Sequence, residues 1–539
     1  MKKILLYISF VLFGLVPAQN LSQKRLEKHL SYLGSDIFGG RGTGEVGGNL
    51  ASKYLALQFD KLNLRPIGDE NTFYQYIPMH GSKVQPDSEL KLVTGNSEKN
   101  LVLNKDYILF NTGDQTFIPN PLPLVFVGYG IFAPEYDYND YADIDVTGKI
   151  VVMLEGEPYS EEAEYFKGEV PTIYSHPEAK QRLAISRGAH GCIIIPFENY
   201  NFKEYWNSKK NQYAFEDVDL AYSVSGNLSL ILNPATSSSL FRSSGYSFEQ
   251  VKRMHYSNKI QSFDLKSKIS FKGKFTERDF FAPNIIGMYE GNDPDLKDEY
   301  IIISAHYDHL GIGPEVKGDN IYNGVFDNAI GTAAVIELAN FIVKNKLHPK
   351  RSIIFILTTG EEKGLLGSQY YIDHPLRPLY KTIANVNIDG IASFDKFKSI
   401  VAPGSEYSTI SQFIGRAAEK NELKIAQIPP EFMSWESFNR SDQMAFAKAG
   451  IPSVLTLDGP DYENLTYQQG IQMVIDYNKN IYHTPFDDLS NKIDYKAALQ
   501  HINFIKDLVL ILANSEETPQ WNAGAPFINA RLRSFAEKK

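Results

Sequence analysis

Cysteine is the scarcest residue in this chain, since 539 residues contain only Cys192. A single thiol excludes a disulfide framework and any zinc site built from several thiolates, so a metal here must be bound by His, Asp and Glu. Basic residues are also in the minority, with 54 Lys and Arg against 64 Asp and Glu. Because phosphate binding needs a surplus of positive charge, this balance excludes a nucleic acid or an anionic membrane surface as the partner.

The apolar run near the start of the chain, residues 4–16, is shorter than the about 20 residues that a membrane-spanning helix needs. It follows Lys2 and Lys3, and it precedes a possible cleavage point with Val16 and Ala18 at the −3 and −1 positions. This arrangement is typical of a secretory signal peptide over residues 1–18. We therefore predict an exported protein, periplasmic or extracellular, that has no membrane anchor after cleavage.

Residues 19–118 are predicted to form the N-terminal part of a domain that the chain resumes after residue 264. They contain a short helix, a glycine-rich turn at 34–48, an amphipathic helix to about residue 62, and several short strands. The glycine-rich turn could bind an anion, but it lacks the Lys-Ser/Thr pair of a phosphate loop. We interpret it as a structural turn.

Residues 119–264 are predicted to form an insert that begins at the proline-rich stretch 119–123. Strand patterns follow at 124–127, 150–154 and 192–195, with a helical segment before the last of them. Residues 125–130, 140–152 and 184–191 resemble the protease-associated domain, which implies an inserted, mainly-β domain. Cys192 is then an inert thiol in its core.

Residues 265–515 are predicted to form the catalytic core, because strands there alternate with helical segments. Its apolar runs are too short for helices and lack the alternation of a half-exposed strand, which favours a sheet covered on both faces. These runs are residues 300–304, 353–357, 383–388 and 452–457. The pattern predicts an α/β fold, with a mixed, largely parallel sheet flanked by helices. Residues 516–539 are predicted to be a solvated C-terminal tail.

Polar residues with metal-binding side chains follow several of these strands. In open α/β sheets, ligands bind beyond the carboxyl ends of the strands, so these side chains should meet at one edge. The set contains two histidines and three carboxylates: His306, Asp327, Glu362, Asp389 and His483. With one carboxylate shared, it supplies three ligands to each of two metal ions. We predict two Zn²⁺ per chain, although Mn²⁺ or Co²⁺ would also suit these ligands.

Three residues beside this set complete the predicted site. Glu361 directly precedes the ligand Glu362 and is not itself needed to bind the two metal ions, so we predict that it is the general base. It would take a proton from a water molecule that bridges the metals and return it to the leaving amine. Asp308 is predicted to orient His306 through a hydrogen bond. His309 is expected to be a bystander rather than a sixth ligand.

Five segments resemble motifs of the co-catalytic zinc aminopeptidase and glutamate carboxypeptidase family. They are residues 306–308, 324–331, 360–368, 387–389 and 482–485. The resemblance implies that one zinc is bound by His306, Asp327 and Asp389, and the other by Asp327, Glu362 and His483. It also implies the same general base, and a cis peptide bond after the shared aspartate.

Two further roles rest on this resemblance alone. Residues 439–442 are similar to an arginine-containing stretch of the family, which implies that Arg440 contacts substrate. Tyr482 is implied to help stabilise the oxyanion, although both residues could instead be structural. Gln443 departs from the pattern, because the family usually has His there, and this affects the detail of the pocket rather than catalysis.

The sequence therefore predicts an exported di-zinc exopeptidase that removes N-terminal residues from peptides. A carboxypeptidase of glutamate carboxypeptidase type is the first alternative, but it would need a basic cluster for two carboxylates, and the motifs offer only Arg440. A monozinc glutaminyl cyclase relative fits less well, because such enzymes usually lack the insert and the full ligand set. A non-catalytic, receptor-like family member is disfavoured, because all five ligands and Glu361 are present. Peptides are the expected partners, and the sequence leaves the oligomeric state open.

Overall fold

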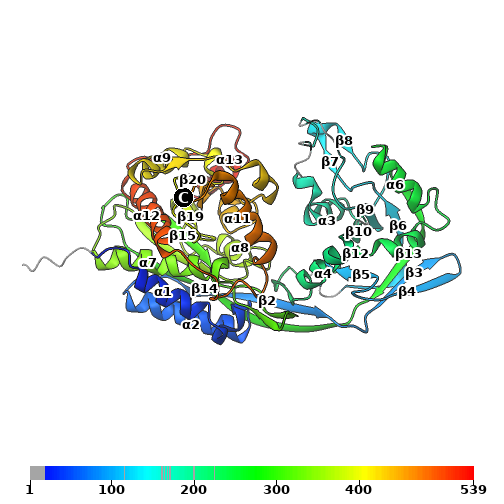
Figure 1. The fold of residues 1–539 in the computed structure, drawn as a ribbon, viewed down its shortest axis with the longest axis horizontal. Helices are drawn as coiled ribbons and strands as arrows, with labels where there is room; N and C mark the ends of the chain where they lie inside the picture. Colours follow the sequence, from blue (N-terminus) through cyan, green and yellow to red (C-terminus); the bar gives the residue numbers. More distant parts are fainter. Residues whose placement is uncertain are drawn as a thin grey trace, which may run out of the picture.

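The computed structural model describes residues 19–538 except 114–115, 160–161, 163, 167, 169–171, 198–200 and 224. The predicted signal peptide, residues 1–18, lies outside the described residues. The chain forms two bodies of secondary structure that are joined by long strands (Figure 1). The first body contains both ends of the described chain, and the second is built from its middle part.

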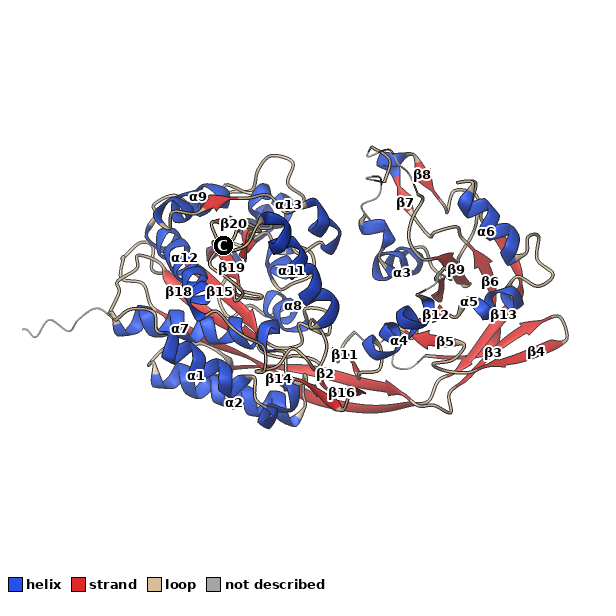
Figure 2. Ribbon diagram, viewed as in Figure 1, coloured by secondary structure: helices blue, strands red, loops and turns tan. Residues whose placement is uncertain are grey.

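The first body is built on a mixed sheet with helices on both faces (Figure 2). In spatial order its strands are β11 (Asp217–Leu220), β2 (Tyr74–Val84), β14 (Phe275–Tyr289), β18 (Ser352–Thr358), β15 (Tyr300–His306), β19 (Thr382–Asn387) and β22 (Ser453–Leu455), with β1 (Arg65–Pro66) beside β14. The four strands from β18 to β22 are parallel, and those on the other side of β18 are antiparallel. This confirms the mixed α/β fold and its parallel core.

Alternate residues of the central strands point into two separate cores. Ile301 and Ile303 lie in a core shared with one layer of helices, whereas Ile302 lies in the core of the opposite face. The first layer contains α1 (Gln23–Leu33), α2 (Val46–Lys61), α7 (Ile330–Lys344), α9 (Ile410–Lys420) and α12 (Tyr495–Asn514), and the second contains α8 (Leu366–Asp373) and α10 (Gln443–Lys448). Burial on both faces explains why these strands read as continuous apolar runs.

One apolar segment, residues 325–344, is long and apolar enough to cross a membrane, but it belongs to this core. It contains α7, and 89% of its most apolar stretch is buried inside the protein. Its composition is therefore explained by packing between the sheet and the neighbouring helices.

The second body is built on another sheet, which contains β4 (Ser97–Leu101), β3 (Glu89–Thr94), β13 (Phe263–Lys272), β6 (Phe117–Phe126), β9 (Ile150–Leu154), β10 (Gly191–Ile195), β12 (Leu228–Leu232) and β5 (Tyr107–Leu109). Its helices are α3 (Pro177–Ser186), α4 (Phe202–Gln212), α5 (Pro234–Leu240) and α6 (Phe248–Tyr256). Cys192 is fully buried in β10, and burial raises the pKa of its thiol to about 12, as expected of an inert core residue. The likeness to a protease-associated domain stays a prediction.

The second sheet extends beyond the predicted insert, residues 119–264, on both sides. The proline-rich stretch does not mark a boundary, because it lies within β6. Pro119, Pro121 and Pro123 occupy every second position of β6. The backbone nitrogens that cannot donate a hydrogen bond therefore all lie on the same side of the strand. Pairing with β9 begins only at Leu124, directly after the last of these prolines.

Two long antiparallel strands, β2 and β14, connect the bodies. They pair along the whole length of β2, and β11 adds to the outer edge of β2. In the sequence, β11 lies between α4 and β12 of the second body. The middle part of the chain therefore returns to the first sheet, and it brings Phe215 and Glu216 beside the loops that follow the parallel strands.

Smaller elements lie outside the two large sheets. They are β7 (Phe132–Ala133) with β8 (Tyr138–Asn139), β16 (Gly311–Val316) with β17 (Asp319–Tyr322), β20 (Ser399–Val401) with β21 (Lys424–Ile425) and β23 (Leu457–Asp458), and the helices α11 (Tyr467–Asn480) and α13 (Ile528–Ala536). The prediction of a solvated C-terminal tail is wrong. Arg531 in α13 is buried and donates to the carbonyls of Leu379 and Thr382, so the last helix is docked on the first body.

Candidate metal centre

Three of the predicted ligands lie where parallel strands end. His306 is the last residue of β15, Glu362 lies in the loop after β18, and Asp389 follows β19. Since β15 pairs in parallel with both β18 and β19, the three side chains reach the same edge of the sheet. This is the arrangement that the strand-end pattern predicted.

The other two ligands come from loops that close over this edge. Asp327 lies in the turn η5 (Val325–Ala329) before α7, and the peptide bond that follows it is cis, as the family resemblance implies. His483 follows α11. The Asp487 carboxylate accepts hydrogen bonds from the backbone N–H groups of Phe326, at 2.8 Å, and Asp327, at 3.0 Å. Asp487 therefore fixes the Asp327 turn against the loop of His483.

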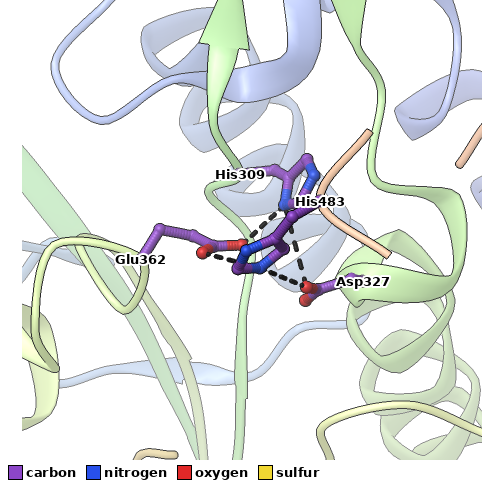
Figure 3. Close-up of side chains that lie close together, drawn as sticks. All are labelled: His309, Asp327, Glu362 and His483. Atoms are coloured by element: carbon purple, nitrogen blue, oxygen red, sulfur yellow. Dashed lines mark hydrogen bonds and ion pairs between the residues drawn. The ribbon is translucent and has the colours of Figure 1, made fainter. Parts of the chain in front are cut away.

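The five side chains form two groups that share Asp327. His306 Nε2 lies 3.2 Å from both Asp327 Oδ1 and Asp389 Oδ1. His483 Nε2 lies 3.1 Å from both Asp327 Oδ2 and Glu362 Oε2 (Figure 3). Two ligand atoms on one tetrahedral zinc ion are about 3.3 Å apart, given zinc–ligand bonds of about 2.0–2.1 Å. The donors are therefore spaced as two adjacent zinc sites with a bridging aspartate require.

The electrostatics of the cluster also suit a cation. Burial alone would lower the pKa of His483, but the Glu362 carboxylate and the hydrogen bond with Asp327 raise it to about 10. Burial would raise the pKa of Asp327, yet hydrogen bonds from His306 and His483 hold it well below its ordinary value. Among the described residues, the ion pairs of Asp327, Glu362 and Asp389 involve histidines alone. A divalent cation would supply the positive charge that the protonated histidines otherwise provide.

Glu361 lies beside both groups without belonging to the pairs above. A carboxylate oxygen of Glu361 lies within 4.8 Å of ligand atoms of His306 and Glu362. Burial raises the pKa of Glu361 well above its ordinary value, and the carboxylates of Asp389 and Glu362 add to the rise while His306 opposes it. This carboxyl group is therefore suited to hold a proton next to the cluster.

The predicted hydrogen bond between Asp308 and His306 is formed by the backbone of Asp308 rather than by its carboxylate. His306 Nδ1 donates to the main-chain carbonyl of Asp308, at 3.1 Å, and the nearer carboxylate oxygen lies 3.9 Å away. The carboxylate turns toward Thr43, whose hydroxyl donates to it at 2.9 Å, and toward the backbone N–H of Glu361, at 3.2 Å. Asp308 therefore orients His306 through its backbone, and its side chain holds the loop of Glu361.

The glycine-rich turn contributes a second support that the sequence did not reveal. Arg41, the last residue of η1 (Asp36–Arg41), is buried and donates to four main-chain carbonyls. Those carbonyls belong to Leu33, Tyr307, Asn323 and Gly324. The turn is thus structural, as expected, and it holds the loops on which His306 and Asp327 lie.

His309 is not the bystander that the sequence suggested. Its side chain is fully buried, and its Nδ1 lies 2.6 Å from Glu362 Oε1 (Figure 3). The sequence signal for a role of His309 in the site was its position three residues after His306, at the end of the same strand.

The two residues predicted to contact substrate, Tyr482 and Arg440, interact electrostatically with each other beside the cluster. The ring of Tyr482 stacks on His483, with centroids 3.8 Å apart. Arg440 is exposed, and its charge acts on both Tyr482 and Tyr213, the residue that follows α4 of the second body. Their roles in catalysis and binding stay predictions.

Gln443, the departure from the family pattern, has a structural explanation. Its buried side chain accepts a hydrogen bond from Asn387 Nδ2 at 2.8 Å. Its amide group donates to the carbonyls of Ser437 and Phe438, each at 2.9 Å. Gln443 therefore packs the segment that contains Arg440 against β19, behind the cluster.

Comparison with known proteins links this cluster to a peptidase family. Residues 284–509 match the sequence profile of Peptidase family M28, and this segment carries all five candidate ligands. A vacuolar membrane protease of Saccharomyces cerevisiae (strain ATCC 204508 / S288c) is 23% identical over 360 residues, which cover 66% of this chain and 30% of that protein. Leupeptin-inactivating enzyme 1 of Streptomyces exfoliatus is 29% identical over 198 residues, which cover 36% of this chain and 40% of that protein.

The fold has a counterpart among solved structures. An aminopeptidase from Aneurinibacillus sp. strain AM-1 has a TM-score of 0.55 and 18% sequence identity, with 92% of this chain and 95% of that chain covered. At this identity the match establishes the fold alone. The chain spans less than half of the length of the two curated relatives.

Proposed function

We propose that this chain is an exported zinc aminopeptidase that hydrolyses the N-terminal residues of peptides, a proposal supported by the match of residues 284–509 to peptidase family M28. The observation that carries the proposal is that Asp327 divides its carboxylate oxygens between two histidine–carboxylate groups. Two metal ions that share one carboxylate require this division. We propose two Zn²⁺ per chain, bound by His306, Asp327 and Asp389 and by Asp327, Glu362 and His483.

The residues around this centre have complementary roles. When bound, zinc lowers the pKa of a coordinated water molecule and stabilises negative charge on a substrate oxygen. Glu361 takes a proton from the attacking water at its carboxylate and gives it to the nitrogen of the leaving amine. Burial and the neighbouring carboxylates keep the Tyr482 hydroxyl protonated, because they raise its pKa well above the ordinary value. This hydroxyl can then donate a hydrogen bond to the carbonyl oxygen under attack.

The charge of the site favours the N-terminal end of a peptide over its C-terminal end. Among the described residues, Asp327, Glu362 and Asp389 form ion pairs with histidines alone, and this excess of acidic groups attracts an α-ammonium group and repels a carboxylate. Arg440 supplies positive charge at the rim, where the rest of the peptide would lie. A carboxypeptidase specific for acidic residues would need several such cations.

A panel of peptide substrates with and without a chelator tests the proposal. We expect the metal-loaded protein to hydrolyse aminoacyl-p-nitroanilides and free N-terminal peptides, and to leave N-acetylated versions of the same peptides intact. The chelator should abolish the activity, and added Zn²⁺ should restore it. Release of C-terminal residues from N-acetylated peptides would instead favour the carboxypeptidase, and a protein that binds less than about one zinc ion per chain would contradict the two-metal site.

Export is proposed from the N-terminal segment, residues 1–18. Directly after it, Gln19 exchanges hydrogen bonds with Asn345, through its N–H at 2.7 Å and its carbonyl at 2.8 Å. We expect N-terminal sequencing of the protein from the periplasm or medium of an expressing bacterium to begin at Gln19. Recovery of the uncleaved chain from the cytoplasm alone would contradict export.

A further inference from the structure

His309 is a buried histidine beside the cluster that the proposed mechanism does not use. It lies in the loop after β15, and its backbone N–H donates to the carbonyl of Arg41 at 3.3 Å. The same contact belongs to an isolated parallel backbone bridge between Gly42 and His309. The backbone of His309 is therefore held by the glycine-rich turn, independently of the ligands.

The imidazole of His309 contacts one oxygen of Glu362, and His483 contacts the other (Figure 3). Its Nδ1 lies 2.6 Å from Glu362 Oε1 and 4.0 Å from Asp327 Oδ2. The second oxygen, Glu362 Oε2, lies 3.1 Å from His483 Nε2. Among the described residues, Nε2 of His309 is buried and has no hydrogen-bond partner. Within the described part of the chain, the contact with Glu362 is thus the one hydrogen bond of this ring.

The length of this contact distinguishes a hydrogen bond from shared coordination. Two ligand atoms on one zinc ion would lie about 3.3 Å apart, because zinc–ligand bonds of about 2.0–2.1 Å meet at tetrahedral angles. The observed 2.6 Å is instead a short hydrogen bond to a carboxylate. Since a carboxylate oxygen only accepts, the proton of the imidazole is on Nδ1.

We infer that His309 is a positioning residue that presents Glu362 to its zinc ion through Oε2 alone. The hydrogen bond occupies Oε1, fixes the carboxylate plane and leaves the second oxygen beside His483. Hydrogen bonds of this kind to metal ligands typically change metal affinity by about 10–100-fold. The inference rests on the proposed metal centre, but it does not depend on which peptides are hydrolysed.

Two variants of His309 separate this role from direct coordination. Removal of the donor in His309→Ala should weaken zinc binding at one of the two sites by about 10–100-fold, measured by competition with a chromophoric chelator. His309→Asn places its amide Nδ2 near the position of Nδ1 and keeps the donor, so it should restore most of the affinity. Co²⁺-substituted His309→Asn should have the wild-type absorption spectrum, because the coordination number is unchanged.

His29 offers a matched control. It is also buried, and its Nδ1 bonds to the hydroxyl of Tyr54 at 2.7 Å, away from the cluster. His29→Ala should therefore leave zinc affinity unchanged. Wild-type affinity at both sites in His309→Ala would overturn the inference. Equal losses in His309→Ala and His309→Asn, with an altered Co²⁺ spectrum, would show direct coordination and also overturn it. Wild-type protein that binds no zinc would overturn the proposed function itself.

Discussion

Replacement of Glu361 by glutamine is expected to lower kcat by about 10²–10⁴-fold while both zinc ions stay bound. Glutamine has nearly the same shape, but it cannot take the proton from the attacking water or return it to the leaving amine. The backbone N–H of residue 361 donates to Asp308 Oδ1 at 3.2 Å, and this contact does not depend on the side chain. The loop that carries Glu362 should therefore keep its position.

The neighbouring carboxylate provides the matched control for this experiment. Glu362→Gln removes the charge next to His483 and His309, so we expect it to lower zinc content as well as turnover. Zinc content by atomic absorption and kcat on one aminoacyl-p-nitroanilide would be measured for both variants. If Glu361→Gln lost zinc and Glu362→Gln kept it, the roles of base and ligand would have to be exchanged.

The fold of the catalytic core could be predicted because its strands are buried on both faces. Runs such as residues 353–357 are apolar at every position, and in the structure they lie in the parallel centre of the first sheet. Polar residues directly after such parallel strands must lie at the carboxyl edge of the sheet. For this reason the strand pattern alone predicts that His306 and Asp389, which are 83 positions apart, meet at that edge.

The supports of the site could not be predicted, because they join segments that no periodic pattern relates. Thr43 binds Asp308 across 265 positions, and His309 binds Glu362 across 53. Each contact depends on the side-chain rotamer and on how a loop closes, which a linear pattern does not encode. The extent of the second sheet was missed for a related reason. β3 pairs with β13 from the far side of the insert and β4 adds to its outer edge, so the proline-rich stretch was misread as a boundary.

Arg41 is the residue for which this long-range support should have the largest effect on stability. Arg41 is 1% exposed, and burial lowers the pKa of its guanidinium to about 10, although nearby carboxylates, Asp487 first, oppose the shift. No ion pair joins Arg41 to a carboxylate in the described part of the chain. Its hydrogen bonds instead go to backbone carbonyls on α1, on the loop after β15 and on the turn before Asp327.

Arg41→Met is therefore expected to lower the free energy of unfolding by about 3–5 kcal/mol, because four buried carbonyls lose a charged donor at once. Arg41→Lys should recover only part of this loss, since an ammonium group cannot reproduce the planar fork of donors. Urea unfolding followed by circular dichroism would measure both changes. Arg65, which is exposed and pairs with Glu290 at 3.5 Å, is the control, and Arg65→Met should cost about 0–1 kcal/mol.

The same variant should also couple stability to zinc. Two of the four carbonyls, those of Asn323 and Gly324, lie just before the turn of Asp327, and the carbonyl of Tyr307 directly follows His306. Loss of Arg41 frees both loops, so the folded Arg41→Met protein should bind zinc more weakly, and excess zinc should recover part of its stability by mass action. An Arg41→Met protein with wild-type zinc affinity would show that the ligands hold their own loops in place, and that Arg41 serves only the packing of α1 against the sheet.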